Sequence, residues 1–461
     1  MAAVVVGGLG VGTFLWFAAV THAALGPAAS DAALLLGLAA GLCGAFGFWY
    51  AYACYFARRA DVGIVSALRY DAVSWALLVV AAFGVVLPLS LGSPARLAAI
   101  ALGLFAIAKL AAAARFVPTV RDVLVAFVVS RISIIVVAEL AAIVIAQRPG
   151  QHVAESANPL LAVWGRWDAV HYLQVAQRGY YGKDMAFFPL YPALIRLVGG
   201  AIGNDLIGGL LVSNGALFFG LLFFYKLVEH QYTRSVARRA IFYVSIFPTA
   251  LFFSAVYTES LFFALTVASF YYIREHRWVV AGLLGGLAAL TRVEGVLLFV
   301  PYVIEAFAAA GNGRAWKPVF ATPARAVRLL AGGLLIPLGL GAYMALLWVL
   351  RGDPLYFTHV QTNWDRHLAP PWASVIHAYR TILHGVHGNA PVLVSGQVIE
   401  ILFTVLMIGV LIGGFRRLRP SFTAYMALSI LVPMSTSSLM SMPRFALVLF
   451  PMFMILALWG G

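Results

Sequence analysis

The sequence has 461 residues, of which 63% are hydrophobic and only 10% are charged, against about 25% charged residues in an ordinary soluble domain. A water-soluble fold is excluded, because too few polar side chains remain to cover a globule of this size, whereas lipid solvates apolar surface directly. The net charge of +14 does not indicate nucleic acid binding, since no arginine-rich stripe with interleaved aromatic residues lies outside the apolar segments; most of the excess is explained by membrane topology.

The apolar segments predict an all-α fold. In hydrocarbon every backbone N–H and C=O must be hydrogen-bonded internally, which leaves helices or a closed barrel. The apolar runs are near-continuous rather than alternating, and each is close to the ~20 residues that a spanning helix needs. We therefore predict a polytopic transmembrane helical bundle of about 14 helices, near residues 3–24, 31–57, 70–92, 96–114, 121–146, 206–229, 241–255, 258–275, 278–291, 293–309, 328–350, 396–415, 420–437 and 444–460.

Lysine and arginine residues predict the orientation of these helices. If the N-terminus is cytoplasmic, more than half of the basic residues fall in loops on the inner side, as the positive-inside rule expects. Two long polar segments, the first outer loop at 147–205 and the second outer loop at 351–395, then lie together on the non-cytoplasmic face. Their Trp, His, Asp and Arg residues make this face the predicted location of the functional site.

The first outer loop contains a candidate general base. Trp164–Pro192 reads WGRWDAVHYLQVAQRGYYGKDMAFFPLYP, and its first half has the pattern of an interfacial helix that Gly179 stops. At helical spacing Asp168 and His171 are neighbours, with the carboxylate toward the mouth of the bundle. Transfer from a sugar phosphate needs only one base, because phosphate is already a good leaving group, whereas a glycosidase pairs two carboxylates. The alternative is that Asp168 caps a turn or pairs with Arg166.

The same segment resembles the phosphatidylinositol-glycan class V (PIG-V) family of mannosyltransferases. The family pattern is WD-x-x-x-(Y/F)-(L/F)-x-x-A-x-x-G-Y followed by A-F-F-P-x-x-P, and it is matched here by Trp167–Asp168, Tyr172–Leu173, Ala176, Gly179–Tyr180, Ala186–Pro189 and Pro192. Further stretches look like bacterial members of the family: FPTALFFSAVYTESLF from Phe247 to Phe262, GLLGGLAALTRVEG from Gly282 to Gly295, and SMPRF from Ser441 to Phe445. The resemblance covers about residues 121–461.

The resemblance implies a GT-C-like fold and an inverting transfer of mannose from a polyprenyl- or dolichyl-phosphate mannose to a lipid-linked or glycan acceptor at the non-cytoplasmic face. It implies that Asp168 is the catalytic aspartate, and that the protein lies among the lipids of a bacterial plasma membrane. Residues 116–461 would form the glycosyltransferase core and residues 1–115 an N-terminal accessory module of transmembrane helices. Glu294 departs from the family, which often has a small or polar residue at that position.

Basic side chains near predicted helix ends are candidates for binding the donor phosphate, because a departing phosphate gains negative charge. Arg444 in SMPRF is the first candidate, and its alternative role is interfacial snorkelling. Arg292 in TRVEG is the second, although Glu294 could simply pair with it. His171 is the third, with an ordinary interfacial histidine as the alternative. Asp184, in the same loop, is expected to be a solvated loop charge.

Further residues are candidates for contacting the sugar or the acceptor, since sugar faces stack on aromatic rings and sugar hydroxyls need hydrogen-bond partners. Glu259 lies at a tight turn in YTES and could orient arginine or the acceptor, with a capping role as the alternative. Trp364 and Asp365 lie in QTNWDRH of the second outer loop, which could instead be a packed loop cap; Trp167 and Tyr172 come from the first. No set of metal ligands is predicted, but a divalent metal at the phosphate is left open.

Two other functional classes compete with a glycosyltransferase. A multi-span lipid or solute transporter or flippase would place ionisable residues near the membrane midplane in broken helices, whereas here most of them lie at one face. A membrane acyltransferase would use a buried histidine, but His22 alone lies in a predicted span, at its outer end. A membrane glycosyltransferase is therefore the leading hypothesis, and the family resemblance implies that it is a polyprenyl-phosphate-mannose-dependent mannosyltransferase.

Overall fold

A computed structural model describes residues 117–144, 159–309, 322–388 and 391–461, together with Cys54, Gly63 and Ala114. The N-terminal accessory module predicted at 1–115, with its four spans, lies outside the described residues apart from these three. Residues Val125–Gly200 and Asn204–Gly461 form one compact unit, and the description below concerns this unit.

The predicted all-α fold is confirmed for the described residues, which contain no strand and only an isolated bridge between Leu368 and Thr436. In chain order the helices are α5 (Pro118–Val144), α6 (Pro159–Ala162), η1 (Val163–Gly165), α7 (Asp168–Arg178), η2 (Gly182–Ala186), α8 (Leu190–Ile202), α9 (Asp205–Gln231), α10 (Arg234–Ser245), η3 (Ala250–Phe253), α11 (Glu259–Arg274), α12 (Trp278–Ala289), η4 (Val293–Leu298), α13 (Phe299–Ala309), α14 (Pro323–Arg351), α15 (Tyr356–His359), η5 (Val360–Trp364), α16 (Pro371–His387), α17 (Pro391–Gly414), α18 (Pro420–Met434), α19 (Met442–Val448) and α20 (Phe450–Trp459).

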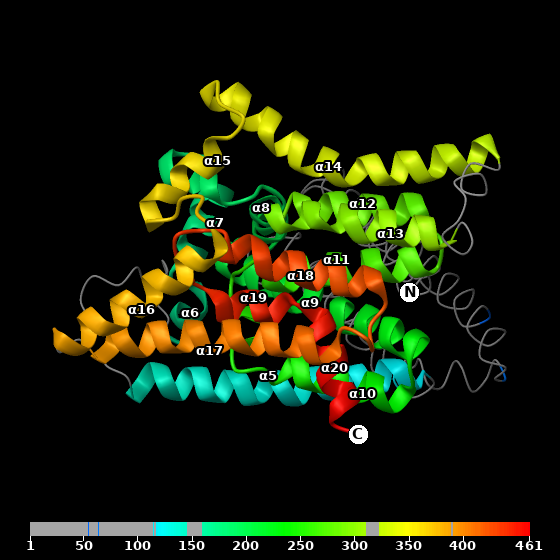
Figure 1. Ribbon diagram of the computed structural model, residues 1–461, viewed down its shortest axis with the longest axis horizontal. Helices are drawn as coiled ribbons and strands as arrows, with labels where there is room; N and C mark the ends of the chain where they lie inside the picture. Colours follow the sequence, from blue (N-terminus) through cyan, green and yellow to red (C-terminus); the bar gives the residue numbers. More distant parts are fainter. Residues whose placement is uncertain are drawn as a thin grey trace, which may run out of the picture. The chain divides into compact units, whose positions relative to one another are not determined.

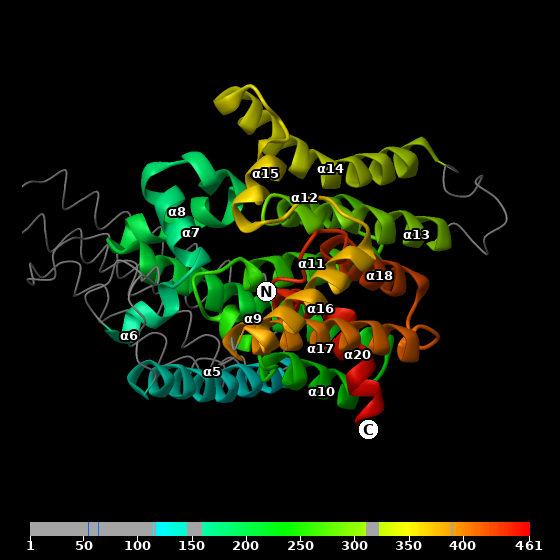
Figure 2. The ribbon, with the colours of Figure 1, turned by 60° about the vertical axis from the view of Figure 1, so that its left-hand side comes forward.

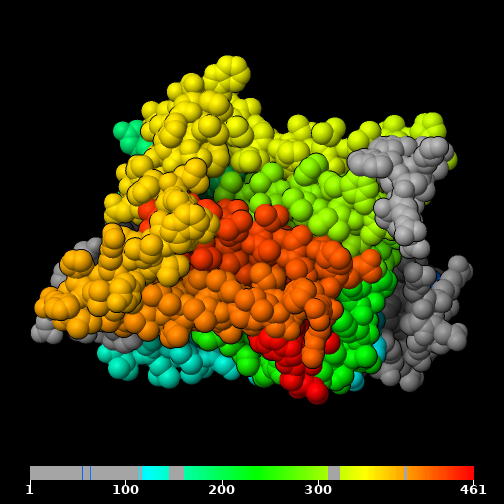
Figure 3. Space-filling view, viewed as in Figure 1, coloured from blue at the N-terminus to red at the C-terminus, as the bar shows by residue number. Residues whose placement is uncertain are grey.

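Among the described residues, α5, α9, α14 and α17 are long and apolar enough to cross a membrane. They correspond to the spans predicted at 121–146, 206–229, 328–350 and 396–415. Leu330, Leu334 and Leu338 are more than half exposed at helical spacing along α14, an apolar stripe that water would disfavour and lipid solvates. Figure 3 shows α14 and α17 on the outer surface. The protein is therefore an integral membrane protein.

The span predicted at 241–255 is wrong, because α10 ends at Ser245 and the chain continues through a turn into the short helix η3. Pro248 lies in this break and has no N–H to continue a helix. Arg131 of α5 compensates for the interruption: its guanidinium donates to the backbone oxygens of Ser245 (2.8 Å) and Ala250 (3.0 Å). The break leaves residues 246–258 irregular where they approach the site.

Two further predicted spans are interrupted. The segment 293–309 divides into η4 and α13, and the segment 444–460 divides into α19 and α20, which are bent by 74°. Pro451 near the start of α20 cannot donate a backbone hydrogen bond, so α19 cannot continue through it. If this bent pair is one span, the described residues hold up to five spans. The segments 258–275, 278–291 and 420–437 form α11, α12 and α18, which are shorter than 18 residues.

The helices pack side by side through close contacts between small residues. Figures 1 and 2 show α14 along one side and α5 along the opposite side, with α9, α11 and α12 between them. Between α12 and α14, a Cβ atom on Gly282 would overlap the backbone of Gly332, and one on Gly339 would overlap the backbone of Gly286. Glycine at these positions lets the two backbones come into direct contact. In lipid the hydrophobic effect does not drive helices together, so the van der Waals packing of such contacts stabilises their association.

The predicted first and second outer loops are partly helical and meet each other. The first contains α7 and α8, the second contains α15 and α16, and η2 of the first contacts both α15 and η5 of the second. Figure 1 shows α7, α8 and α15 near the end of α14. Residues far apart in sequence are therefore brought to one end of the bundle.

Candidate active site

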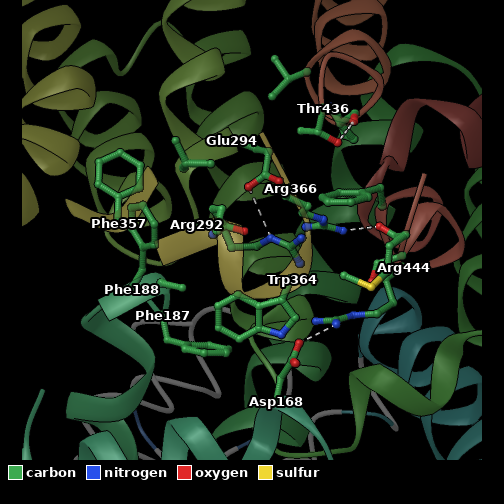
Figure 4. A pocket seen from close by; sticks show the side chains of 18 of the residues that line it. Asp168, Phe187, Phe188, Arg292, Glu294, Phe357, Trp364, Arg366, Thr436 and Arg444 are labelled. Atoms are coloured by element: carbon green, nitrogen blue, oxygen red, sulfur yellow. Dashed lines mark hydrogen bonds and ion pairs between the residues drawn. The ribbon is translucent and has the colours of Figure 1, made fainter. Parts of the chain in front are cut away.

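A cavity of about 840 Å³ opens where the two loops meet. Its wall includes two carboxylates and three guanidinium groups, which come from four separate segments, and Figure 4 shows these side chains together: Asp168, Arg292, Glu294, Arg366 and Arg444. Aromatic and aliphatic side chains form most of the remaining wall. The cavity therefore combines a small charged region with an apolar one, as expected of a site for an amphiphilic ligand.

Asp168 is the first residue of α7, and the backbone aims its side chain into the cavity. Trp167 before it has φ of 56°, a left-handed conformation that turns the chain sharply into the helix, and Gly179 with φ of 81° ends the helix. The ring of Tyr172, one turn on, packs edge to face against Phe187 and Tyr191 and fixes the other face of α7. This packing leaves the Asp168 side chain 28% exposed.

Arg444 of α19 forms the main contact of Asp168. Its Nη1 donates to Asp168 Oδ2 at 2.6 Å, across 276 residues of sequence, so the proposed alternative in which Asp168 pairs with Arg166 is not what the structure shows. The guanidinium also lies over the rings of Tyr257 and Phe252, with distances of 4.7 and 5.1 Å to the ring centroids. An arginine held by both ion pairing and rings is fixed in orientation.

The start of α19 is itself anchored. Ser441 has φ of 74°, and the N–H groups of Ser441 and Met442 donate to the two carboxylate oxygens of Glu400, at 2.9 and 2.8 Å. Glu400 belongs to α17, so a spanning helix holds the short helix that carries Arg444. A carboxylate that accepts the first N–H groups of a helix satisfies donors that would otherwise be unpaired.

Glu259 lies behind the cavity wall as the first residue of α11, with no exposed surface. Its Oε1 accepts from Arg444 Nε at 2.8 Å and lies 2.7 Å from Arg444 Nη2 and 3.1 Å from Arg292 Nη1. The predicted contact of Glu259 with substrate does not fit a buried side chain. The geometry instead fits the other role considered from the sequence, in which Glu259 orients arginine.

Arg292 lies between α12 and η4 and is paired with two carboxylates. Besides Glu259, its Nε lies 3.5 Å from Glu294 Oε2, so the expected Arg292–Glu294 pair is present. Burial lowers the pKa of Arg292, but the charges of Glu294 and Glu259 outweigh burial and raise the pKa above its ordinary value. The Arg292 guanidinium is therefore held firmly in its charged form.

His171 does not line the cavity. Its Nδ1 lies 2.7 Å from Asp184 Oδ1, and its ring stacks on Phe187 with a centroid separation of 4.7 Å. The expectation that Asp184 is a solvated loop charge is wrong, because Asp184 is only 8% exposed and pairs with His171. This pair joins α7 to η2, and the burial of both partners favours a structural role for His171 over phosphate binding.

The remaining predicted site residues divide into two groups. Trp167, Tyr172 and Trp364 line the cavity, whereas Asp365 is exposed and does not line it. The neighbouring Arg366 does line the cavity and was not singled out from the sequence. The sequence signal for Arg366 was an arginine two residues after Trp364 in a polar outer loop. The sequence could not show that Arg366 would face the cavity and Asp365 would face away from it, because that depends on the backbone conformation of the turn.

No cluster of three or more His, Cys, Asp or Glu side chains able to hold a metal ion occurs within the described ranges. The guanidinium groups of Arg292, Arg366 and Arg444 are cationic groups on the cavity wall, and binding an anion such as phosphate is a role that they can fill. Arginine is suited to that role because its planar donors match the oxygens of a phosphate.

The helical fold, the spanning helices and the cavity at one end of the bundle define a membrane protein whose site combines charged and apolar surfaces. Residues 113–307 match the family model described as Mannosyltransferase (PIG-V). The resemblance predicted from the first outer loop is confirmed over this part of the chain, which contains Asp168, Glu259 and Arg292. The match supports a glycosyltransferase.

Two curated relatives agree with this match. Both are named GPI mannosyltransferase 2 and come from Cryptococcus neoformans var. neoformans serotype D, strains JEC21 / ATCC MYA-565 and B-3501A; each is 31% identical over 161 residues. The similar region covers 32% of this chain and 37% of each relative, so the match spans little more than a third of the relatives' length. No solved structure matches the chain.

Proposed function

We propose that this protein is an inverting membrane mannosyltransferase that uses a polyprenyl-phosphate mannose donor. The observation that carries the proposal is the ion pair between Asp168 and Arg444 on the cavity wall, 2.6 Å long and supported from behind by Glu259. It places a carboxylate beside fixed positive charge at the boundary between a polar and an apolar wall. The PIG-V match over residues 113–307 supports mannose as the transferred sugar.

Asp168 acts as the general base. Its Oδ2 is held by Arg444, while Oδ1 makes no hydrogen bond within the described residues and is the oxygen available to take a proton. The acceptor hydroxyl attacks the anomeric carbon, its proton passes to Asp168 Oδ1, and the bond from the anomeric carbon to the phosphate oxygen breaks. The electron pair of that bond leaves on the phosphate, so no second carboxylic acid is needed.

The guanidinium groups of Arg292, Arg366 and Arg444 supply the positive potential that the departing phosphate requires. On the apolar side, Phe188, Phe357 and Val293 line the cavity and fit the first part of a polyprenyl chain. On the polar side, the rings of Trp167 and Trp364 face the cavity and are suited to stacking on a sugar. The composition of this wall supports binding of the donor in the described cavity.

The acceptor is a lipid-linked or other glycan, and the site faces the non-cytoplasmic side of a bacterial plasma membrane. The distribution of basic residues supports this orientation, because the two loops that form the cavity lie on the side opposite to most of the basic loops. Donor and acceptor would then meet at the membrane surface, with the donor lipid remaining in the bilayer.

The proposal is tested by the Asp168→Asn variant. Membranes that contain the protein are incubated with radiolabelled polyprenyl-phosphate mannose, and transfer of label to lipid and glycan products is measured. We expect transfer to fall by about 100-fold or more, because the amide cannot take the proton. Asp353→Asn, in the second outer loop and outside the cavity, is the matched control and should keep activity.

Both variants are compared by thermal unfolding, so that loss of the base is separated from loss of the fold. Wild-type transfer activity in the Asp168→Asn variant would remove Asp168 from the mechanism. Absence of transfer by the wild-type protein, together with movement of a lipid or solute across proteoliposomes without donor consumption, would favour a transporter instead.

A further inference from the structure

The three guanidinium groups on the cavity wall, those of Arg292, Arg366 and Arg444, differ in how many carboxylates they contact. Arg444 contacts Asp168 and Glu259, and Arg292 contacts Glu259 and Glu294. Both are therefore tied to two carboxylates each. A further anion at either group would have to compete with partners that are already in place.

Arg366 is different, because within the described part of the chain it forms no ion pair with a carboxylate. Its one side-chain hydrogen bond runs from Nη2 to the backbone oxygen of Met440, and its Nε is closed off from solvent without a partner. A guanidinium has five N–H donors and no way to lose its charge near neutral pH. In a site with little water, donors left unmatched carry a free-energy penalty that a bound anion would remove.

The electrostatics of the cavity agree with an unmatched charge. Burial and the charges of Arg444 and Arg292 lower the pKa of Arg366, and the carboxylates of Glu294 and Asp168 oppose this lowering without cancelling it. Figure 4 shows the Arg366 side chain among those of Arg292, Glu294 and Arg444. The region around Arg366 is therefore where the cavity has most to gain from negative charge.

The backbone around Arg366 is held in place before any ligand binds. Asp365 has φ of 52°, which turns the chain so that Arg366 enters the cavity while Asp365 stays outside. The following residues pair with the turn after α18: Ser437 N donates to His367 O at 3.0 Å, and Ala369 N donates to Ser435 O at 3.0 Å. Arg366 is thus presented on a fixed loop, which lowers the entropic cost of binding.

We propose that Arg366 binds the phosphate of the lipid-linked donor directly, while Arg444 stays paired with Asp168 and orients the base, and Arg292 stays paired with Glu259 and Glu294. This inference rests on the function proposed above and names the phosphate ligand of the same site. The phosphodiester of the donor has one negative charge. As the glycosidic bond breaks, the electron pair stays on the phosphate oxygen, and the unmatched charge of Arg366 meets the growing negative charge.

The test measures binding and does not require transfer. The full chain is purified in nanodiscs, and the dissociation constants of farnesyl phosphate, farnesol and inorganic phosphate are measured by the quenching of tryptophan fluorescence. We expect Arg366→Gln to weaken farnesyl phosphate binding at least about tenfold, equivalent to ~1.4 kcal/mol. Arg366→Lys should be intermediate, since lysine keeps the charge and loses the paired donors. The exposed Arg380→Gln is the matched control and should bind as wild type does.

Three outcomes would overturn the assignment. Wild-type affinity of Arg366→Gln for farnesyl phosphate would show that another group binds the phosphate. An equal loss of farnesol binding would show that Arg366 acts by packing. Binding of inorganic phosphate as tight as that of farnesyl phosphate would show a free-phosphate site. Because the binding assay requires no transfer, wild-type farnesyl phosphate affinity of Arg366→Gln would overturn the binding proposal alone, whereas wild-type transfer by Asp168→Asn would overturn the proposed reaction alone.

Discussion

Glu259 and Arg444 are joined by two short contacts, from Glu259 Oε1 to Arg444 Nε at 2.8 Å and to Arg444 Nη2 at 2.7 Å, although 185 residues separate them in sequence. Because the same oxygen also reaches Arg292 at 3.1 Å, one buried carboxylate sets the position of two arginines. In the proposed mechanism Glu259 is therefore a positioning residue: it contacts Arg444 and Arg292 and does not itself line the cavity.

Replacement of Glu259 by Gln should destabilise the protein and lower transfer. A neutral amide cannot offset two buried guanidinium charges, and removal of one partner from a buried ion pair costs about 3 kcal/mol or more. Thermal unfolding in detergent and mannose transfer are the measurements. Glu275→Gln, at the exposed end of the same helix, is the control, and equal unfolding midpoints for the two variants would contradict the role assigned to Glu259.

Replacement of His171 by Leu should lower stability and leave the KM for the donor unchanged. Asp184 would lose its partner while remaining buried, which costs about 1–3 kcal/mol for an unsatisfied polar group, whereas the cavity wall would keep its composition. Thermal unfolding and donor titration separate the two effects, with the exposed His377→Leu as the control. A large rise in the donor KM at unchanged stability would instead favour the phosphate-binding role predicted for His171 from the sequence.

Replacement of Gly286 by Ala should disrupt the contact between α12 and α14. An added Cβ would overlap the backbone oxygen of Leu335. The helices would have to move apart to admit it, and overpacking of this kind costs about 1–3 kcal/mol of stability. Gly341→Ala in α14 is the matched control, because no atom lies within 4 Å of its added Cβ. Thermal unfolding should show a lower midpoint for Gly286→Ala alone; a similar fall in both variants would indicate a general intolerance of alanine.

The helical fold class, four of the spanning helices and the candidate residue Asp168 were predictable from the sequence. Long apolar runs require helices in lipid whatever their neighbours are, so α5, α9, α14 and α17 were predicted at nearly the observed positions. Asp168 was predictable because an acidic residue in an aromatic interfacial helix stands out locally, and because the surrounding motif resembles that of a known family.

The interruptions were not predictable from hydrophobicity. The segment 241–255 is apolar enough for a span, but Pro248 and the hydrogen bonds of Arg131 stabilise a break there. Similarly, the bend between α19 and α20 places Arg444 at the cavity, although the sequence shows only one apolar run. The average hydrophobicity of a segment reflects the free energy of its transfer from water into lipid. It contains no information on where the backbone of that segment bends.

The sequence by itself determined that the chain lies in a membrane, that it is helical, and that Asp168 and Trp364 belong to two long polar segments. The tertiary structure alone decided which charges meet: Glu259 with Arg444 and Arg292, His171 with Asp184, and Arg366 without a carboxylate. The physical reason is the range of each effect. Transfer into lipid depends on the composition of a single segment, whereas an ion pair depends on side-chain atoms brought within about 4 Å by the packing of distant helices.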